Sequence, residues 1–477
     1  MTSMNHRAGL DRSQTLLLPE RLEDYLAAEN PVRFLDAFVA SLDLHTLGFA
    51  KARCANTGRP PYDPAALLKL YLYGYLHRVR SSRLLEAECH RNVEVLWLLG
   101  KLAPDHKTIA DFRKDNLKPL KAVARQFTLL CRKLELFGGE LLAIDGSKFA
   151  AVNARDQNFN AAKLQDLIAR ADARLAGYLK ELDAADTAEP APGVLNKTQL
   201  AEKIAALREK QDWHKELLDQ LDADEKQVSV TDPDTRKMPA AHGMMVGYNA
   251  QMAVDAKHKL IAADDVTNEV TDCQQLANVA LAAQANLELQ QAEVVADAGY
   301  YNAAEVSRCV ARGLTPFIPK ADTSANTARG LYGKRQFQYD AGQDVYVCPA
   351  GAELTYRFAT YELGRELRYY RASGCRQCAL KSRCTRNQAN RTITREANEA
   401  LMEAMAARLR AQPWKFKLRK TLAEHPFGTI KRWFGYTHFL LKGLEKVRCE
   451  WSLTTLAYNL KRVLNLVSFA KLMAAVG

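Results

Sequence analysis

Hydrophobic residues recur three and four positions apart in the amino-terminal part of the chain, which predicts helices there. Asp63-Pro64 is a helix-start signal, because the carboxylate can cap the first amides and proline suits the first helical position. The apolar face that follows runs from Leu67 to Leu76. Further helices are predicted over residues 82–89, 93–99 and 106–117. Short helices with capped turns are typical of a helix-turn-helix module, and a plain helical bundle would show the same pattern.

Two apolar runs farther along the chain each end in an aspartate closely followed by a glycine. They are Glu140 to Gly146 and Glu293 to Gly299, and both predict a buried strand. Residues 147–152 are predicted to form a partner strand, and further strands are expected over 246–254, 260–266 and 315–319. Helices are predicted over 272–287, 303–312 and 396–410, so this part of the chain has an α/β pattern.

Two long stretches differ from this α/β pattern. Residues 160–226 are rich in Ala, Leu, Lys and Glu, and a Pro/Gly break at 189–193 divides them into two predicted helices. Residues 330–395 are rich in Tyr, Arg and Gly and have little helical period, so they predict a β-rich insertion. After Pro413 the pattern is helical and basic.

The charged residues are distributed unevenly along the chain. The 477 residues carry a net charge of +12, and 48% of them are hydrophobic. Residues 401–477 hold fourteen Lys/Arg against four Asp/Glu, whereas residues 156–235 hold ten against seventeen. The carboxyl-terminal part therefore suits a phosphate backbone, and the acidic helical stretch does not. With neither a signal peptide nor a membrane-length apolar run, and with scattered cysteines, we expect a reducing, cytoplasmic context and no membrane.

Asp145 and Asp297 are the candidate catalytic groups, since each follows a predicted buried strand. Two neighbouring carboxylates repel each other unless a cation lies between them, and Mg²⁺ or Mn²⁺ prefers oxygen ligands. A third carboxylate, Glu424, lies on a predicted helix seven residues before Lys431, and the two are expected to share a helix face. Taken singly, each aspartate is more commonly a turn or cap residue, and the Glu424 helix could be an ordinary surface helix.

Four cysteines lie in the β-rich stretch, at Cys348, Cys375, Cys378 and Cys384. Four thiolates could make a tetrahedral zinc site, and basic residues surround them. The spacing is irregular, so reduced structural cysteines are an equal alternative.

Together these motifs resemble the DDE transposases of bacterial insertion sequences. The resemblance rests on Ile144 to Lys148, on Val295 to Tyr301, on Glu424 to Lys431, on Ala457 to Arg462 and on the helices between Pro60 and Asn116. A large group of these enzymes has Tyr seven and Arg four residues before the glutamate. Here Lys417 and Lys420 stand at those positions, which keeps the positive charge but loses the ring and the bidentate guanidinium.

The resemblance implies a ribonuclease-H-like mixed sheet with flanking helices. It implies a helical DNA-binding domain over residues 1–135 and a catalytic domain over 136–477, which an acidic helical insertion (156–235) and a β-rich basic insertion (330–395) interrupt. Asp145, Asp297 and Glu424 would hold two Mg²⁺ (or Mn²⁺) ions. Water would then attack the phosphodiester at the element's end, and the freed 3′-hydroxyl would attack target DNA.

The implied partner is double-stranded DNA, as terminal inverted repeats and as target, at the nucleoid. Lys417, Lys420, Lys431 and Arg432 are expected to contact it, and the active complex is expected to be a homodimer. Two alternatives remain open from the residues: a metal-dependent nuclease that does not join strands, and a DNA-binding protein without enzymatic activity.

Overall fold

The computed structural model describes residues 21–53, 60–153, 157–185, 197–221, 227–240, 243–320, 325–362 and 365–477. The chain divides into two compact units, one of residues 1–124 with 456–477 and the other of residues 125–455. The predicted domain boundary at residue 135 stays a prediction. Among the described residues, every helix is too short or too polar to cross a membrane. The Pro/Gly break predicted at 189–193 lies outside the described residues.

The first unit is helical, as the capped apolar patterns predict. The Asp63 carboxylate accepts a hydrogen bond from the Ala65 amide (2.8 Å), and Pro64 is the first residue of its helix. Tyr71 is fully buried, and its hydroxyl donates to the Ile109 carbonyl (2.7 Å). The helices are α1 (Pro31–Ala40), α2 (Pro64–Leu76), α3 (Ser82–Arg91), α4 (Val93–Leu98), α5 (His106–Asp115) and α16 (Phe469–Val476), while α6 (Leu117–Lys133) and α15 (Leu444–Leu466) each begin in one unit and end in the other.

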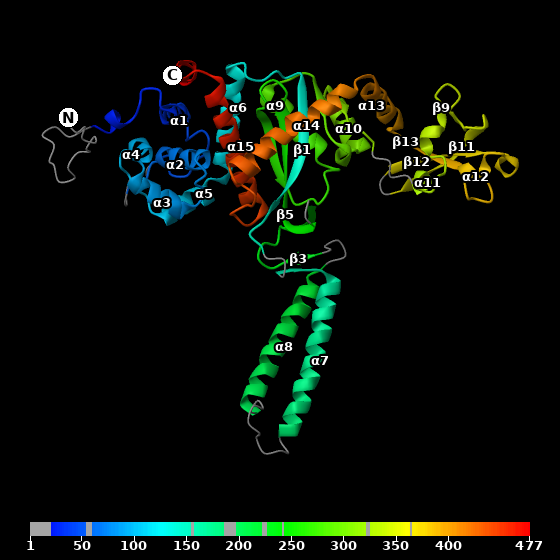
Figure 1. The fold of residues 1–477 in the computed structure, drawn as a ribbon, viewed down its shortest axis with the longest axis horizontal. Coiled ribbons are helices and arrows are strands. Elements are labelled where there is room, and N and C mark those ends of the chain that lie inside the picture. The colour runs from blue at the N-terminus through cyan, green and yellow to red at the C-terminus, as the bar shows by residue number, and fades with distance from the viewer. Residues whose placement is uncertain are drawn as a thin grey trace, which may run out of the picture. The chain divides into compact units, whose positions relative to one another are not determined.

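The second unit is built on a mixed sheet whose central strand is β1 (Leu141–Ala150) (Figure 1). On one side β1 pairs antiparallel with β5 (Gly243–Asp255), which also pairs with β4 (Arg236–Ala240) and β6 (Ile261–Thr267). On the other side β7 (Ala292–Val295) runs parallel to β1, and β8 (Leu314–Phe317) runs parallel to β7. A central first strand with antiparallel neighbours on one side and parallel neighbours on the other is the ribonuclease-H-like arrangement, which confirms the predicted fold class.

The prediction of a separate strand over residues 147–152 is wrong. Strand β1 continues without a turn from Leu141 to Ala150, and its second half pairs with the first half of β5. The two backbones come so close there that a Cβ on Gly247 would lie 2.0 Å from the Phe149 carbonyl oxygen. Gly146 is the only residue there that could indicate a turn. Strand β1 accommodates this glycine without a turn.

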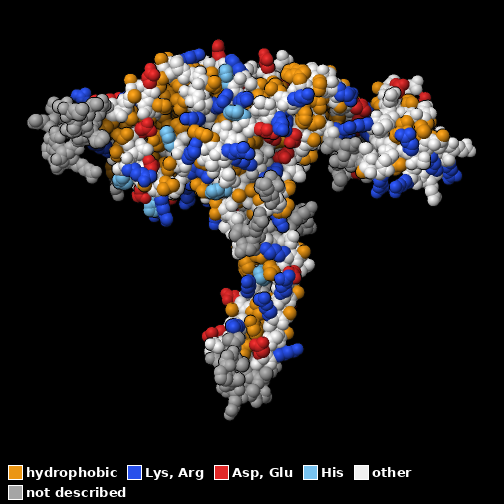
Figure 2. Space-filling view, viewed as in Figure 1, with side chains coloured by type: hydrophobic (Ala, Val, Ile, Leu, Met, Phe, Trp, Pro, Cys, Tyr) orange, Lys and Arg blue, Asp and Glu red, His pale blue; other side chains and the backbone are white. Residues whose placement is uncertain are grey.

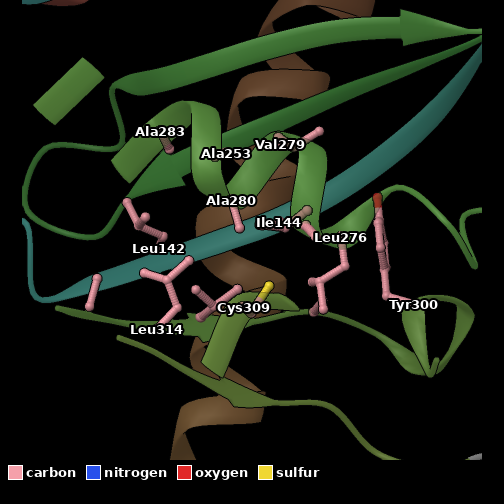
Figure 3. Packing of buried hydrophobic residues seen from close by; sticks show 14 of the residues in the cluster. Leu142, Ile144, Ala253, Leu276, Val279, Ala280, Ala283, Tyr300, Cys309 and Leu314 are labelled. Carbon is pink, nitrogen blue, oxygen red and sulfur yellow. The ribbon is translucent and has the colours of Figure 1, made fainter. Parts of the chain in front are cut away.

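Helices cover both faces of the sheet. On one face, α9 (Leu276–Leu287), α10 (Ala303–Val310) and α13 (Glu399–Ala411) enclose an apolar core with the sheet residues Leu142, Ile144 and Val294 (Figure 3). On the other face, α14 (Pro413–Gly428) packs Leu422 and Ala423 against β1, β7 and β8. The two core layers hold the ends of β1 and β7 in fixed positions.

Two insertions extend from this unit. Helices α7 (Ala161–Ala185) and α8 (Lys197–Asp219) lie side by side, and both Asp/Glu and Lys/Arg side chains line the face drawn in Figure 2. The short strands β2 (Asn158–Phe159) and β3 (Val228–Ser229) pair at their base. The predicted β-rich insertion is confirmed: an antiparallel sheet contains β9 (Gln338–Asp340), β10 (Val345–Val347), β11 (Glu353–Glu362), β12 (Arg365–Ala372) and β13 (Thr392–Glu396), with the short helices α11 (Ala325–Ala328) and α12 (Lys381–Cys384) beside it.

Gly247→Ala tests the close approach of β1 and β5. A methyl group 2.0 Å from a backbone oxygen forces the strands apart, so the free energy of unfolding is expected to fall by about 1–3 kcal/mol. Gly177→Ala is the matched control, because Gly177 lies inside α7 with nothing within 4 Å of its added Cβ, and alanine there favours the helix. Denaturant titrations of both variants measure the difference. Equal stabilities would contradict the proposed clash.

Candidate active site

Asp145 and Asp297 lie at matching positions of neighbouring parallel strands. The pairing of β1 with β7 places Ala143 opposite Val295, so the aspartates follow these partners by two residues on each strand. Asp145 lies within β1, and Asp297 comes just after β7, where its side chain accepts a hydrogen bond from the Gly299 amide (2.8 Å). The structure thus brings together the two aspartates that the sequence singles out.

The Asp145 carboxylate is poorly hydrated. Its side chain is 16% exposed, and the Gly146 amide donates to its Oδ1 (3.0 Å). Burial raises the pKa of Asp145 to about 6, the Arg419 guanidinium opposes this rise, and the charges of Asp297 and Asp272 add to it. A buried carboxylate with carboxylate neighbours favours a bound cation, because the cation offsets both the desolvation and the repulsion.

Arg419 supplies positive charge beside the two aspartates. Its Nη1 lies 3.2 Å from Asp145 Oδ1 and 3.9 Å from Asp297 Oδ2. The Nε and Nη1 atoms are buried, and neither makes a hydrogen bond of good geometry among the described residues. The guanidinium therefore offsets the charge of the pair without satisfying all of its own donors.

Sequence reasoning missed Arg419, although a signal was present. Helix α14 buries Lys415, Leu422, Ala423 and Pro426, and Arg419 lies on the same face at helical spacing. A cation on an apolar helix face needs a buried partner, and the two aspartates are the acidic groups it faces. Lys417 and Lys420 occupy the Tyr and Arg positions of the motif that the sequence resembles. Both lie on the exposed face of α14 instead.

Glu424 does not complete a ligand group with the aspartate pair, because no three acidic, His or Cys side chains of the described residues are placed to hold a metal ion. Its side chain is exposed on α14, on the same outer face as Lys417 and Lys420. Arg432 is exposed as well.

Lys431 points at the sheet. Its Nζ donates to the Ser147 hydroxyl (2.6 Å) and to the Lys148 carbonyl (3.1 Å), and it lies 4.5 Å from the centre of the Phe149 ring. Burial lowers the pKa of Lys431, and the Asp145 charge opposes this effect. The expectation that Glu424 and Lys431 share a face assumes an α-helix throughout, whereas Glu424 lies in α14 and Lys431 lies in a π-helical turn that follows it, η6 (Thr429–Trp433).

The four cysteines of the β-rich insertion line one cavity of about 30 Å³. They come from three segments: Cys348 follows β10, Cys375 and Cys378 lie in and after the turn η5 (Cys375–Gln377), and Cys384 ends α12. All four are reduced and half-buried. Burial raises the pKa of Cys384, Arg391 opposes this, and the other three thiols add to it.

The donor atoms at both places suit metal ions, but neither place is a finished ligand set. Across the described ranges, no group of three His, Cys, Asp or Glu side chains stands close enough to hold a metal ion. Carboxylate oxygens suit a hard divalent cation, and four thiols suit zinc. The raised pKa of Asp145 and the nearby Asp297 carboxylate make the aspartate pair a place that favours positive charge.

A ribonuclease-H-like sheet with two adjacent aspartates, one largely buried and one partly exposed, is typical of enzymes that act on phosphodiesters with divalent metal ions. Two family models match the chain. One, described as "Transposase DDE domain", matches residues 347–464, and the other, described as "Transposase domain (DUF772)", matches residues 20–115. Both matches are to transposase models, one of them a DDE domain, and they support a transposase enzyme that acts on DNA with divalent metal ions.

Other comparisons add little. No curated protein matches the sequence. A cryo-EM structure of the piggyBac transposase synaptic complex with hairpin DNA aligns with 96% of this chain and 81% of its own, at 9% identity and a TM-score of 0.32, which is too low to support any inference. The two family matches include Glu424, Lys431 and the four cysteines but neither aspartate, so the roles of the site residues stay predictions.

The pKa of Asp145 predicts a pH dependence of stability. The folded chain holds a proton on Asp145 up to about pH 6, whereas the unfolded chain releases it near its usual pKa of 3.8. The free energy of unfolding should therefore fall as pH rises from about 4 to about 6, by on the order of 2–3 kcal/mol. Denaturant titrations with a chelator present measure this. Asp145→Asn removes the titrating group and should flatten the profile, so equal slopes in both proteins would contradict the assignment.

Proposed function

We propose that the enzyme cuts DNA at the ends of a mobile element and joins the freed 3′-hydroxyl to target DNA. The observation that carries this proposal is the matched placement of Asp145 and Asp297 around one buried guanidinium. Two acidic groups held together on neighbouring central strands serve phosphoryl transfer better than they serve stability, because a cation relieves their repulsion.

Each half of the reaction exchanges one bond to phosphorus for another. In cleavage, the oxygen of water bonds to phosphorus and the bond to the 3′-oxygen breaks, which leaves a 3′-hydroxyl and a 5′-phosphate. In joining, that 3′-hydroxyl bonds to a target phosphorus and a target 3′-oxygen leaves. When bound, divalent cations supply activation of the attacking oxygen and stabilisation of the leaving oxygen. We propose Mg²⁺, or Mn²⁺ in its place.

The chain's own residues have distinct proposed roles. Asp145 and Asp297 would hold the cation, and Arg419 would withdraw from between them as it binds. Glu424 is proposed as the third acidic residue, since α14 carries both it and Arg419. Lys431 is held against Ser147 and Lys148 beside the site, where its charge would face a phosphate.

DNA recognition is assigned to basic, exposed positions. Lys417, Lys420 and Arg432 lie on the outer face of the α14 region and would contact phosphates without reading bases. We further propose that residues 1–135 form a DNA-binding domain for the terminal inverted repeats and residues 136–477 the catalytic domain. A homodimer would hold two element ends together, and its substrate would be chromosomal DNA at the nucleoid of the cytoplasm.

Asp145→Asn and Asp297→Asn should each lower both cleavage and joining by roughly 100-fold or more, because each removes a charge that the cation needs. Glu424→Gln should do the same if Glu424 joins the pair. Gel assays with an intact element end measure cleavage, and assays with a pre-cleaved 3′-hydroxyl end measure joining.

Asp265→Asn is the matched control for these variants. Asp265 lies in the same sheet and pairs with Arg448 (3.1 Å), so the variant changes the net charge equally while leaving the site intact. Cleavage without joining from the pre-cleaved end would identify a nuclease. DNA binding with no Mg²⁺-dependent cleavage would identify a DNA-binding protein, and full activity in Asp145→Asn would remove the proposed site.

We also propose that Cys348, Cys375, Cys378 and Cys384 bind a structural Zn²⁺. The apolar core of the β-rich insertion is small, with Tyr346, Leu354 and Tyr370 among its few buried side chains, and small folds commonly need a metal or disulfide to be stable. The four thiols line one cavity of this core, and their side chains would turn into it on binding. Arg391, which donates to the Cys384 carbonyl (3.2 Å), would offset the thiolate charge.

This zinc proposal predicts about one zinc ion per chain in protein purified without chelator. Replacing Cys375 and Cys378 together with serine should abolish the bound zinc and make the insertion more sensitive to proteolysis. Cys273→Ser, which changes a half-buried cysteine outside the insertion, should leave both unchanged. Mass spectrometry of metal content and limited proteolysis measure the two effects, and zinc-free wild-type protein of equal protease resistance would contradict the site.

A further inference from the structure

Asp272 is a partly buried acidic residue that sequence analysis treats only as the start of a helix. Helix α9 begins later, at Leu276, and its N-cap residue is Gln275, with no side-chain cap. The Asp272 carboxylate instead accepts hydrogen bonds at Oδ1 from Asn249 Nδ2 (2.7 Å) and Gln251 Nε2 (2.7 Å). Its side chain is 22% exposed. The ordinary use of such an aspartate, helix capping, is therefore not its use here.

The partners of Asp272 come from the two strands at the centre of the sheet. Lys148 on β1 places its Nζ 3.3 Å from Asp272 Oδ1, and it pairs in register with Asn249 on β5, as Gly146 pairs with Gln251. Because side chains alternate along a strand, Gly146 and Lys148 face away from the side on which Asp145 meets Arg419. Asp272 thus lies behind the aspartate pair, on the opposite face of β1.

Glycines after both aspartates let the backbone pack against Asp272. A Cβ on Gly146 would lie 2.8 Å from Asp272 Oδ1 and 2.3 Å from Gln251 Nε2. A Cβ on Gly299 would lie 3.7 Å from Asp272 Oδ2 and 2.9 Å from Asp297 Oδ1. The glycine after Asp145 therefore leaves room for Asp272 and Gln251, whereas at Gly299 the close contact is with Asp297 itself and Asp272 lies at ordinary van der Waals distance.

A buried hydrogen-bond chain fixes this arrangement. Tyr300 follows Asp297 in the turn η3 (Ala298–Tyr300), and its fully buried hydroxyl donates to Gln251 Oε1. The same amide group then donates to Asp272 through Nε2. The segment after Asp297 is tied through this amide to β5 and to Asp272. Burial and the charges of Asp272, Asp145 and Asp297 all raise the pKa of Tyr300, so its hydroxyl stays a donor.

We propose that Asp272 is a positioning residue of the transposase site. It holds the backbone after Asp145 in place through its close packing on Gly146, and the segment after Asp297 through the Tyr300–Gln251 chain, and its negative charge strengthens cation binding at the pair. The inference rests on the proposed role of Asp145 and Asp297 as the cation site. Removing a residue that supports metal ligands typically weakens metal affinity by about tenfold or more.

Calorimetric titration of the full chain with Mn²⁺, without DNA, tests this role directly. Asp272→Asn keeps the size of the side chain and an acceptor for Asn249 and Gln251 but removes the charge, and Mn²⁺ affinity should fall about tenfold. Asp265→Asn removes one charge elsewhere in the same sheet and should leave the affinity within about twofold. Saturating Mg²⁺ should restore most cleavage by Asp272→Asn, because the residue does not touch DNA or the reacting atoms.

Two comparisons distinguish the positioning role of Asp272 from the proposed cation site at Asp145 and Asp297. If Asp145→Asn loses Mn²⁺ binding while Asp272→Asn binds like wild type, the positioning role is wrong and the cation site stands. If Asp145→Asn also binds like wild type, the cation site itself is wrong. Should Asp272→Asn fail to fold, Tyr300→Phe replaces it in the experiment. Loss of the Tyr300 hydroxyl should weaken Mn²⁺ binding by roughly threefold, less than the Asp272 substitution, because Tyr300 reaches Asp272 only through Gln251. Unchanged Mn²⁺ affinity would overturn the proposal.

Discussion

The parallel pairing of β1 with β7 is the constraint on which the site depends. By setting Ala143 opposite Val295, it brings Asp145 and Asp297 to the same level of the sheet. The apolar layers on both faces hold the two strands there, so the carboxylates cannot move apart to relieve their repulsion. Hydrophobic burial thus supports an unfavourable electrostatic arrangement, which is common at functional sites.

Positive charge reaches this pair from a distant part of the chain. Helix α14 packs Leu422 and Ala423 into one apolar layer, and the same packing carries Arg419 between the aspartates. On the opposite face of β1, Asp272 keeps its hydrogen bonds to Asn249 and Gln251. The sheet therefore places the positive charge of Arg419 on one face of β1 and the negative charge of Asp272 on the other.

The sequence is sufficient for the elements and for the aspartates, because strands that end in Asp-Gly and helices that begin at capped prolines are local signals. It is not sufficient for what depends on three-dimensional packing. The continuity of β1 past Gly146 depends on pairing with β5, and the place of Arg419 depends on which face of α14 is buried. The π-helical turn changes the direction of the Lys431 side chain, and residue spacing alone does not predict such a turn. The exposed position of Glu424 could not be read from the motif either.

The order in which the ribosome makes these segments has a consequence for the host cell. Ser147 and Lys431 hydrogen-bond across 284 residues of chain, so the contacts between β1 and the α14 region are among the last that synthesis allows. Domains fold as units while the chain emerges, and long loops close late. A nascent or prematurely ended chain would have its aspartates without α14, which carries Arg419 and Glu424, and without Lys431 in the turn that follows. Under the proposed function, an unfinished copy would therefore lack part of its active site and could not cut DNA.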